Sequence, residues 1–368
     1  MDMENFTFHL LEKQYENKSA LKVIAEYICL HSHTAKPLPD LYCEEFPIKH
    51  TLGIQIFVFV AFTSIIMTSV VGNCIVMWII AKHKVMHRGF NYFLFNMALA
   101  DFLIALLNVG TTWTFNFYYD WWFGDFCAAN LFFGVTPTCV SVFTMTVVSC
   151  DRCKAVVNPL WKRPLTNKRT IFVITLIWLS ATCIALPVVI NSKIEKHYYF
   201  SSSSRQLTIQ WLCLNEFKYK VLYDNSLLLI QYVIPLIILS ATYARIACAL
   251  QTKQELRESV KQSVTGQSKK KVVKMLAVVV TIFMVCWLPY QLYHALLERM
   301  IQDFDIASNS YMIFYWLAMS ASVYNPFIYC YTNGRFRIGF RYAFRWLPWI
   351  NCSYNEYRNS ALFKELPR

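Results

Sequence analysis

The sequence predicts a bundle of seven membrane-spanning helices, and two observations lead to this fold class. Of the 368 residues, 56% are apolar and only 15% are charged, whereas soluble domains carry about 25% charged residues. Seven stretches are almost free of Asp, Glu, Lys and Arg, and each holds the roughly 20 residues that a helix needs to cross a bilayer. Because a strand of a membrane barrel needs only about 9 to 11 residues, the chain is predicted to be an all-α membrane protein.

The charge-free stretches set the order of the elements. Residues 1–50 precede the bundle, which spans residues 51–334, and its helices are expected at about 53–81, 90–117, 126–150, 170–191, 225–247, 273–297 and 307–332. After the seventh helix, phenylalanines recur at every fourth position from Phe336 to Phe344, with arginines beside them. This pattern predicts a short amphipathic eighth helix on the membrane surface over residues 335–347, followed by a tail over residues 348–368.

The basic residues predict the orientation, because loops rich in Lys and Arg stay on the cytosolic side of a membrane. With the N-terminus outside, the inner loops and tail hold 24 of the 35 basic residues and the outer segments hold 11. The net charge of +13 is therefore assigned to loops that face anionic lipid, and no nucleic-acid partner is expected. We expect a multi-pass protein of the plasma membrane with an extracellular N-terminus and a cytoplasmic C-terminus.

The same orientation sorts the cysteines, since only the outer ones meet an oxidising compartment. Cys127 begins the third helix and Cys213 precedes the fifth, so a disulfide between them would hold the intervening loop over the bundle. Cys29 and Cys43 would close a small loop near the N-terminus. The alternative for either pair is that it stays reduced.

Three further residues are candidates for covalent modification. Asn5 and Asn17 head glycosylation sequons in the outer N-terminal segment. Cys352 follows the predicted surface helix and is a candidate for palmitoylation, with a free thiol as the alternative.

Short motifs fall at defined depths in the predicted helices. They are Gly72-Asn73 in the first helix, residues 96–101 in the second, Asp151-Arg152-Cys153 at the end of the third, Trp178 in the fourth, Pro235 with Tyr243 in the fifth, Phe283 with residues 286–289 in the sixth and residues 325–329 in the seventh. In this order and spacing they resemble the rhodopsin-like G-protein-coupled receptors over residues 72–350. Within that family, residues 91–94, 271–275, 316–320 and 335–340 look like tachykinin receptors.

The resemblance implies a receptor that transmits the binding of a neuropeptide, first of all a tachykinin-like amidated peptide, to a heterotrimeric G protein. Arrestin and receptor kinases are further partners that it implies. Receptors for RYamide- or luqin-like peptides and for neuropeptide Y-like peptides are the alternative. Two residues depart from the pattern: Cys153 replaces the usual Tyr, which bears on G-protein contact, and Asp101 stands where vertebrate tachykinin receptors carry Glu. Gly134 stands where amine receptors of the family carry Asp, so a monoamine ligand is disfavoured.

Asp101 lies inside the second predicted helix, where a charged group costs about 2.5 to 3.5 kcal/mol on insertion scales. It is therefore expected to face the bundle interior and to bind polar partners. Ser141, Ser322 and Asn325 could supply them. The resemblance implies that this cluster holds a sodium ion with water in the resting state, and the alternative is a hydrogen-bonded carboxyl group that only joins helices.

Residues near the inner end of the bundle are candidates for activation. Asp151 can hold the guanidinium of Arg152 in a charge-assisted pair, and the resemblance implies that activation frees Arg152 to meet two tyrosines and a G protein. Prolines in the sixth and seventh helices remove intrahelical hydrogen bonds and create hinges, beside which aromatic residues could transmit a change in the pocket; plain packing is their alternative role. The activation residues are thus predicted to be Asp151, Arg152, Tyr243, Phe283, Trp287, Pro289, Asn325, Pro326 and Tyr329.

Helical periodicity places polar and aromatic side chains on single faces of the second, sixth and seventh helices. A mostly apolar cavity with a few polar groups suits the aromatic or amidated end of a peptide. Hydrogen bonding between helices is the alternative role for each of these residues. The candidate ligand contacts are Asn108, Thr112, Asn116, Trp287, Tyr290, Gln291, His294, Tyr311 and Tyr315.

Other classes of protein fit the sequence poorly. A transporter would need several charges along a pathway through the membrane, and a single Asp is too few. No His, Glu or Cys cluster has the spacing of a metal site or a catalytic triad, so the chain is not expected to be an enzyme. Apart from the sodium ion, no cofactor is expected.

Overall fold

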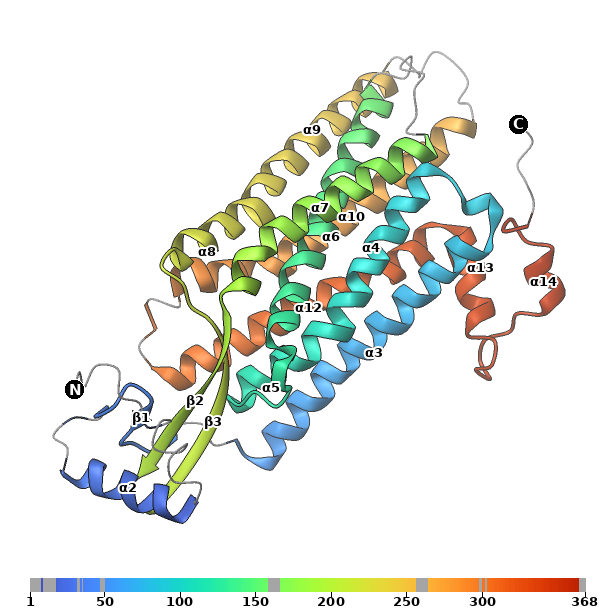
Figure 1. Cartoon of the computed structure of the whole chain (residues 1–368). Coiled ribbons are helices and arrows are strands. Elements are labelled where there is room, and N and C mark those ends of the chain that lie inside the picture. Colours follow the sequence, from blue (N-terminus) through green and yellow to red (C-terminus); the bar gives the residue numbers. More distant parts are fainter. Residues whose placement is uncertain are drawn as a thin grey trace.

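The computed structural model is an elongated bundle of helices with a small sheet at one end (Figure 1). It describes residues 8, 18–31, 34, 36–46, 50–157, 166–255, 264–297, 300, 301 and 303–363, without the side chains of residues 250–276. The bundle consists of α3 (Leu52–Lys82), α4 (Gly89–Ile104) continued by α5 (Gly110–Tyr118), α6 (Cys127–Val157), α7 (Asn167–Ile190), α8 (Lys220–Leu228) continued by α9 (Ile234–Glu255), α10 (Val264–Leu292) and α12 (Phe304–Thr332).

The predicted fold class, a seven-helix membrane bundle, is confirmed. Among the described residues, six helical segments are long and apolar enough to cross a membrane. The seventh is α12, which has 29 residues and packs against α10 and α3. Its apolar content is lower because Ser320, Ser322 and Asn325 lie on it, and all three are buried inside the bundle.

Three of the long helices contain a π-helical turn that the sequence pattern did not predict. These turns are Ala105–Val109 between α4 and α5, Leu229–Val233 between α8 and α9, and Tyr293–Leu297 after α10. A π-helical turn inserts one residue into an α-helix and is frequent at functional sites. The first turn carries Asn108 and the third carries His294, two of the predicted ligand contacts.

The contact between α3 and α12 is built around Pro326. Proline has no N–H group, so the carbonyl of Ser322, four residues earlier, loses its partner within the helix. The side-chain amide of Asn73 on α3 donates to that carbonyl at 3.2 Å. Gly72 makes the close approach of the two helices feasible, since a Cβ atom there would lie 2.9 Å from Cγ of Pro326. The two residues of the Gly72-Asn73 motif therefore both serve the hinge in α12.

A second polar contact joins three helices. The indole N–H of Trp178 on α7 donates to the side-chain oxygen of Asn96 on α4 at 2.8 Å. The amide nitrogen of Asn96 donates to the hydroxyl of Thr144 on α6, also at 2.8 Å. Both the oxygen and the nitrogen of the Asn96 amide are thus hydrogen-bonded inside the bundle, and these bonds hold α4 against α6 and α7.

A folded cover lies at the sheet end of the bundle. It consists of α2 (Lys18–His31), β1 (Leu41–Tyr42), β2 (Ser192–Ser201) and β3 (Gln206–Asn215). The sheet order is β1-β2-β3, with β1 parallel and β3 antiparallel to β2. α2 packs on the sheet through an apolar cluster that includes Leu21, Ala25, Tyr198 and Phe200.

Two disulfides fasten the cover. The predicted Cys127–Cys213 bond is confirmed and ties β3 to the first residue of α6. Cys29 and Cys43 are also bonded and hold the end of α2 next to β1. Asn5 and Asn17, the predicted glycosylation sites, lie outside the described residues.

The chain after the bundle differs from the sequence-based expectation. The amphipathic helix, α13, spans Gly334–Ala343 and ends four residues before the predicted limit of 347. Phe344 has left the helical conformation, and Pro348 disfavours helical geometry in the residue before it. The following segment, predicted only as a tail, folds back through α14 (Tyr354–Arg358) against α13 (Figure 1).

Candidate functional site

A polar cluster lies at the middle of the bundle, around the buried Asp101. The amide nitrogen of Asn325 donates to the Asp101 carboxylate at 2.7 Å, and Ser141 is also hydrogen-bonded to that carboxylate. Ser322 differs from the expectation, because its hydroxyl donates to the carbonyl of Met319 at 2.8 Å. The structure therefore joins Asp101 directly to two of its three predicted partners, while Ser322 faces the same small cavity.

This cavity has a volume of about 30 Å³ and is bordered by Asp101, Ser141, Ser322 and Asn325 on its polar side. A single water needs roughly 10 to 15 Å³ of such space, so the cavity has room for very few small guests. Among the described residues, no three His, Cys, Asp or Glu side chains gather as a transition-metal site would require. Carboxylate and hydroxyl oxygens instead suit a hard cation with water.

The opposite wall of the cavity is aromatic. Phe283 and Trp287 both border it, and their ring centroids are 5.4 Å apart. Pro289 interrupts the hydrogen bonds of α10 just beyond Trp287. Tyr232, in the π-helical turn before α9, donates to the carbonyl of Met284 at 2.9 Å. The polar cluster and the proline hinge of α10 therefore share one cavity, so a movement of Trp287 changes the surroundings of Asp101.

The C-terminal end of α6 holds Arg152 in the predicted pair. Its guanidinium contacts the Asp151 carboxylate and lies 4.8 Å from the ring centroid of Phe90. Tyr243 instead hydrogen-bonds Ser149 at 3.2 Å. Nε of Arg152 and the hydroxyl of Tyr329 are buried without a hydrogen-bond partner among the described residues. Buried polar groups of this kind are rare, and these two are the ones expected to find partners in another conformation.

The predicted ligand contacts on α10 and α12 form an aromatic wall. Tyr290 lies 5.8 Å from Trp287, 5.9 Å from Tyr311 and 6.0 Å from Tyr315, measured between ring centroids. Tyr311 and Tyr315 stack at 5.7 Å with nearly parallel rings. The exposed ring of His294 lies 4.6 Å from Tyr290. These side chains of the sixth and seventh helices thus form one aromatic cluster.

A polar network faces this wall and contains a residue that sequence reasoning missed, Asn130. Its side-chain oxygen accepts hydrogen bonds from Asn108 at 2.8 Å and from Thr111 at 2.7 Å. Tyr315 donates to the Asn108 oxygen at 3.3 Å, so the network joins α12, the second helix and α6. The signal that could have found Asn130 is a polar amide inside an apolar membrane-spanning segment, since such a residue usually faces the bundle interior.

The remaining predicted contacts divide into two groups. Thr112 belongs to the network, since its hydroxyl accepts from Asn108 at 2.9 Å. Asn116 uses its amide nitrogen on the carbonyl of Thr112 in its own helix, at 2.8 Å. Gln291 is buried and its side chain makes no hydrogen bond to another described residue. Of the predicted amides, Gln291 is therefore the one whose side chain makes no hydrogen bond to a described residue.

The space over Gly134 is filled by the same network. A Cβ atom at this position would lie 3.1 Å from the amide nitrogen of Asn108. An acidic side chain could enter only by displacing Asn108 from Asn130. A side chain at position 134 would therefore press on the amide network of Asn108 and Asn130.

Comparison with known proteins identifies the family of this bundle. The family model described as 7 transmembrane receptor (rhodopsin family) matches residues 72–329. The chain is 48% identical over 323 residues to the probable G-protein coupled receptor tkr-1 of Caenorhabditis elegans, covering 87% of this chain and 78% of that protein. It is 35% identical to the tachykinin-like peptides receptor 99D of Drosophila melanogaster (80% and 58% covered) and 37% identical to the substance-K receptor of Mus musculus (78% and 75% covered).

The chain belongs to the rhodopsin family of seven-transmembrane receptors. The resemblance predicted from the motifs is confirmed, and so is the expectation that the protein is not an enzyme, because this family consists of receptors. The receptor is a multi-pass membrane protein. Its family match ends at Tyr329, so α13 and α14 lie beyond the matched segment.

Two further predicted features differ in whether the structure describes them. The side chains of residues 271–275, one of the tachykinin-like runs, are outside the described part of the chain. Cys352, the palmitoylation candidate, is described and is buried, with 6% of its surface exposed.

Proposed function

We propose that this receptor binds a C-terminally amidated, tachykinin-like neuropeptide in the outer half of its bundle and transmits binding to a heterotrimeric G protein. The observation that carries the proposal is an arrangement of side chains, in which an aromatic wall meets a network of neutral amides through the hydrogen bond from Tyr315 to Asn108. A peptide amide is neutral and can enter such a cavity without the desolvation cost of a free carboxylate. The relatives support the peptide class, since two of them are named as receptors for tachykinin-like peptides and substance K.

Gln291 is the residue proposed to bind the terminal amide. Its side chain is largely buried, it directly follows Tyr290 of the aromatic wall, and it makes no hydrogen bond to another described residue. A buried amide that gains a hydrogen bond on binding contributes roughly 0.5 to 1.5 kcal/mol, and a free acid in its place brings a charge that the pocket cannot pair. The amide form of the peptide should therefore be favoured.

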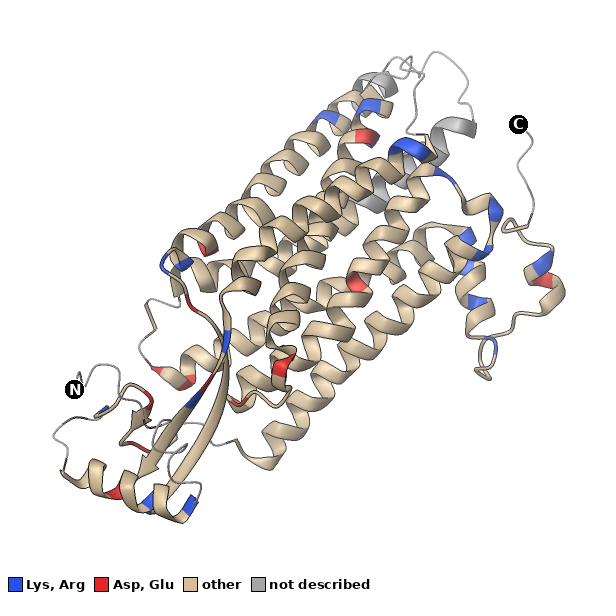
Figure 2. Ribbon diagram, in the orientation of Figure 1, with Lys and Arg blue, Asp and Glu red and all other residues tan. Residues whose placement is uncertain are grey.

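The proposed orientation places the sheet end outside the plasma membrane and the C-terminus in the cytoplasm. In the part of the chain that the structure describes, Lys and Arg gather around the end away from the sheet, on the loop after α3, the start of α7 and α13 (Figure 2). Asp and Glu lie mainly at the sheet end (Figure 2). This distribution agrees with the rule that basic segments remain in the cytosol. In this orientation Asn5 and Asn17 are available for glycosylation, and arrestin and receptor kinases can reach the inner end.

The cluster around Asp101 is proposed to hold a sodium ion in the resting receptor. Asp101, Ser141 and Ser322 are the residues that would supply oxygen ligands. The cavity of about 30 Å³ fits a small cation with water. The ion would add positive charge beside Asp101, and binding of Asn325 to Asp101 already restrains α12 near Pro326.

The decisive experiment compares each active peptide in its amide and free-acid forms on cells that express this chain, read by calcium and cyclic AMP. The amide is expected to be at least about tenfold more potent, which corresponds to 1.4 kcal/mol. Gln291→Leu should reduce that ratio, whereas Asn116→Ala, whose amide serves its own helix, should leave it near the wild-type value. Equal potency of acid and amide would contradict the assignment. Activation by an RYamide-, luqin- or neuropeptide Y-like peptide alone would replace the tachykinin class by one of these.

A further inference from the structure

The segment of residues 350–363 is bound to the receptor body far more closely than a tail requires. Three of its side chains, Cys352, Tyr357 and Leu362, are buried and belong to the main apolar core. The ring of Tyr357 stacks on Tyr342 of α13 at 3.8 Å with an interplanar angle of 5°. Trp78 of α3 lies 6.4 Å from both tyrosine rings. This segment therefore fills an aromatic surface made by α3 and α13.

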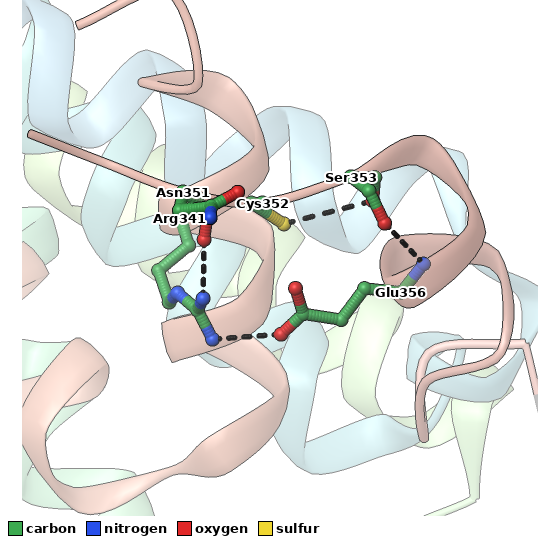
Figure 3. Close-up of polar contacts among 5 residues, drawn as sticks. All are labelled: Arg341, Asn351, Cys352, Ser353 and Glu356. Atoms are coloured by element: carbon green, nitrogen blue, oxygen red, sulfur yellow. Dashed lines mark hydrogen bonds and ion pairs between the residues drawn. The ribbon is translucent and has the colours of Figure 1, made fainter. Parts of the chain in front are cut away.

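Polar contacts hold the same segment from the other side. Arg341 of α13 forms an ion pair with Glu356 at 2.9 Å and also binds the carbonyl of Asn351 (Figure 3). Ser353 caps α14 by accepting from the N–H of Glu356 at 3.1 Å (Figure 3). Cys352 lies between Asn351 and Ser353, and its Sγ lies 4.0 Å from the Ser353 carbonyl oxygen (Figure 3).

His83, directly after α3, makes the central hydrogen bond. Its Nδ1 lies 2.9 Å from the carbonyl of Ile79, which can only accept, so Nδ1 carries the proton. Nε2 then has a lone pair for the hydroxyl of Tyr357, at 2.6 Å. In the neutral imidazole both ring nitrogens are therefore hydrogen-bonded, and a second ring proton would require the Tyr357 hydroxyl to turn and accept.

We propose that residues 350–363 are a clasp, which closes over the surface of Trp78, His83 and Tyr342 and withholds Cys352 from acylation. Only the open clasp exposes the thiol. Acylation transfers a fatty acyl group from a thioester carrier: the Cys352 sulfur forms the new C–S bond, the bond to the carrier sulfur breaks, and the proton passes to the carrier thiol. No oxidant or reductant takes part. An acylated Cys352 cannot return to its buried position, because the chain of carbon atoms has no room there, so modification keeps the clasp open.

The proposal rests on the orientation given above, which places this end in the cytosol. Near neutral pH the clasp stays closed, because burial lowers the pKa of His83. The charged or titratable groups that face His83 are Lys82 and His87 on its own segment and Tyr357 on α14. Among the described residues no carboxylate faces it, since Glu356 is paired with Arg341. Protonation would therefore add an unpaired buried cation and open the clasp.

The first test measures the alkylation rate of Cys352 in purified full-length receptor, by mass spectrometry of the peptide that contains it. Tyr357→Ala should raise the rate at least about tenfold, while Tyr354→Ala, an exposed tyrosine on the same helix, should change it little. Arg341→Ala, which removes only surface contacts, should raise it to a smaller extent. A Cys352 that reacts as fast in the wild-type receptor as in Tyr357→Ala would overturn the clasp. The assay needs no peptide ligand, so its outcome is independent of the proposed ligand class.

The second test uses pH. The ratio of the wild-type rate to the Tyr357→Ala rate cancels the intrinsic pH dependence of the thiol. Below the ordinary His pKa of about 6.5 the open form binds more protons than the closed form, so the ratio should rise by up to about tenfold between pH 7.5 and 5.5. His83→Phe should give a ratio that does not depend on pH. A ratio that is constant in the wild type, or a rise that persists in His83→Phe, would contradict the role of His83.

The third test concerns acylation itself in cells. Thioester-specific exchange labelling at Cys352 should increase several-fold in Tyr357→Ala relative to wild type and remain unchanged in Tyr354→Ala. Equal acylation in all three would show that the clasp does not control access to Cys352.

Discussion

At the scale of single residues, glycines and amides decide how closely the helices of this receptor approach. Gly72 lets the ring of Pro326 touch α3, and Asn73 supplies the hydrogen bond that proline removes from α12. These two contacts reach α12 at Pro326 and at the carbonyl of Ser322, both within three residues of Asn325. A one-atom change at Gly72 therefore bears on the same hinge that joins Asp101 to α12.

Gly72→Ala is expected to destabilise the receptor by about 1 to 3 kcal/mol, because a proline ring cannot move aside and the helices must separate. Gly53→Ala is the matched control: it lies on the same helix, and a Cβ atom there would meet nothing within 4 Å. The thermal unfolding midpoint of the solubilised receptor should fall for the first variant and stay level or rise for the second. Equal midpoints would show that α3 and α12 are less tightly packed than described.

Asp101→Asn tests the proposed sodium site. Removal of the carboxylate charge should abolish sodium binding while keeping a hydrogen bond to Asn325. Wild-type agonist affinity is expected to fall about fivefold or more when choline is replaced by sodium at constant ionic strength. The variant should bind agonist equally in both salts. A sodium effect of normal size in Asp101→Asn would place the ion elsewhere.

Sequence reasoning reached most of the single residues but not their partners. Asp101, Arg152 and Trp287 were predicted because a charge, a charge pair and a proline beside an aromatic residue are unusual in an apolar helix. Asn130 and Tyr342 were missed, since each becomes important only through side chains that fold beside it. The hydroxyl of Ser322 was assigned to Asp101, whereas a serine inside a helix can equally bind a carbonyl of its own preceding turn.

At the scale of elements, the cover has an apolar core of its own, separate from the core of the bundle. α2 lies on the sheet through an apolar cluster, and its end is joined to residue 43 by a disulfide. The second disulfide joins the sheet to α6. α2 is therefore connected to the bundle mainly through the sheet and these two covalent links.

Replacement of Cys29 and Cys43 by Ala together should loosen α2 without unfolding the bundle. The disulfide closes a loop of 14 residues, for which loss of the bond costs about 3 kcal/mol. Hydrogen exchange of residues 18–31 should become faster, while α6 keeps its protection. Cys183→Ala removes a free, exposed cysteine and should change neither region. Unchanged protection of α2 in the double variant would show that the apolar cluster alone holds it.

The helices could be predicted from hydropathy, because a bilayer requires long uncharged segments whatever their partners. The π-helical turns could not, since an inserted residue leaves the apolar content of a helix unchanged. α13 was predicted too long because the Phe and Arg pattern continues past the point at which the backbone leaves the helix. α2 was missed although it is amphipathic, because its apolar stretch is interrupted by Lys22 and Glu26 and is too short to cross a bilayer. α14 was missed because it has only five residues and is stabilised by tertiary contacts.

At the scale of the whole molecule, the proposed ligand site and the end of the bundle that carries Arg152 are joined through the middle cavity. Trp287 lies below the aromatic wall and borders the cavity of Asp101, and Asn325 and Pro326 follow on α12. Arg152 lies roughly 30 Å from the pocket by helix rise, too far for direct contact with a ligand. Loss of Arg152 should therefore impair coupling to the G protein without a direct effect on ligand binding.

Arg152→Ala is expected to abolish nucleotide exchange on the G protein and to leave antagonist affinity unchanged, while agonist affinity falls through lost coupling. Lys154→Ala, an exposed cation on the same helix, is the control and should retain exchange. Both should be compared at matched surface expression. Full exchange by Arg152→Ala would remove Arg152 from the coupling machinery.

The lower apolar content of α12 also bears on how the chain enters the membrane during synthesis. A segment leaves the translocon for lipid according to the summed cost of its side chains, and Asn and Pro oppose that transfer. In the folded receptor these groups of α12 are bound by Asn73 on α3 and Asp101 on α4. The last helix therefore gains a favourable environment only after the first two are in place, and its insertion into the bilayer depends on residues synthesised more than two hundred positions earlier.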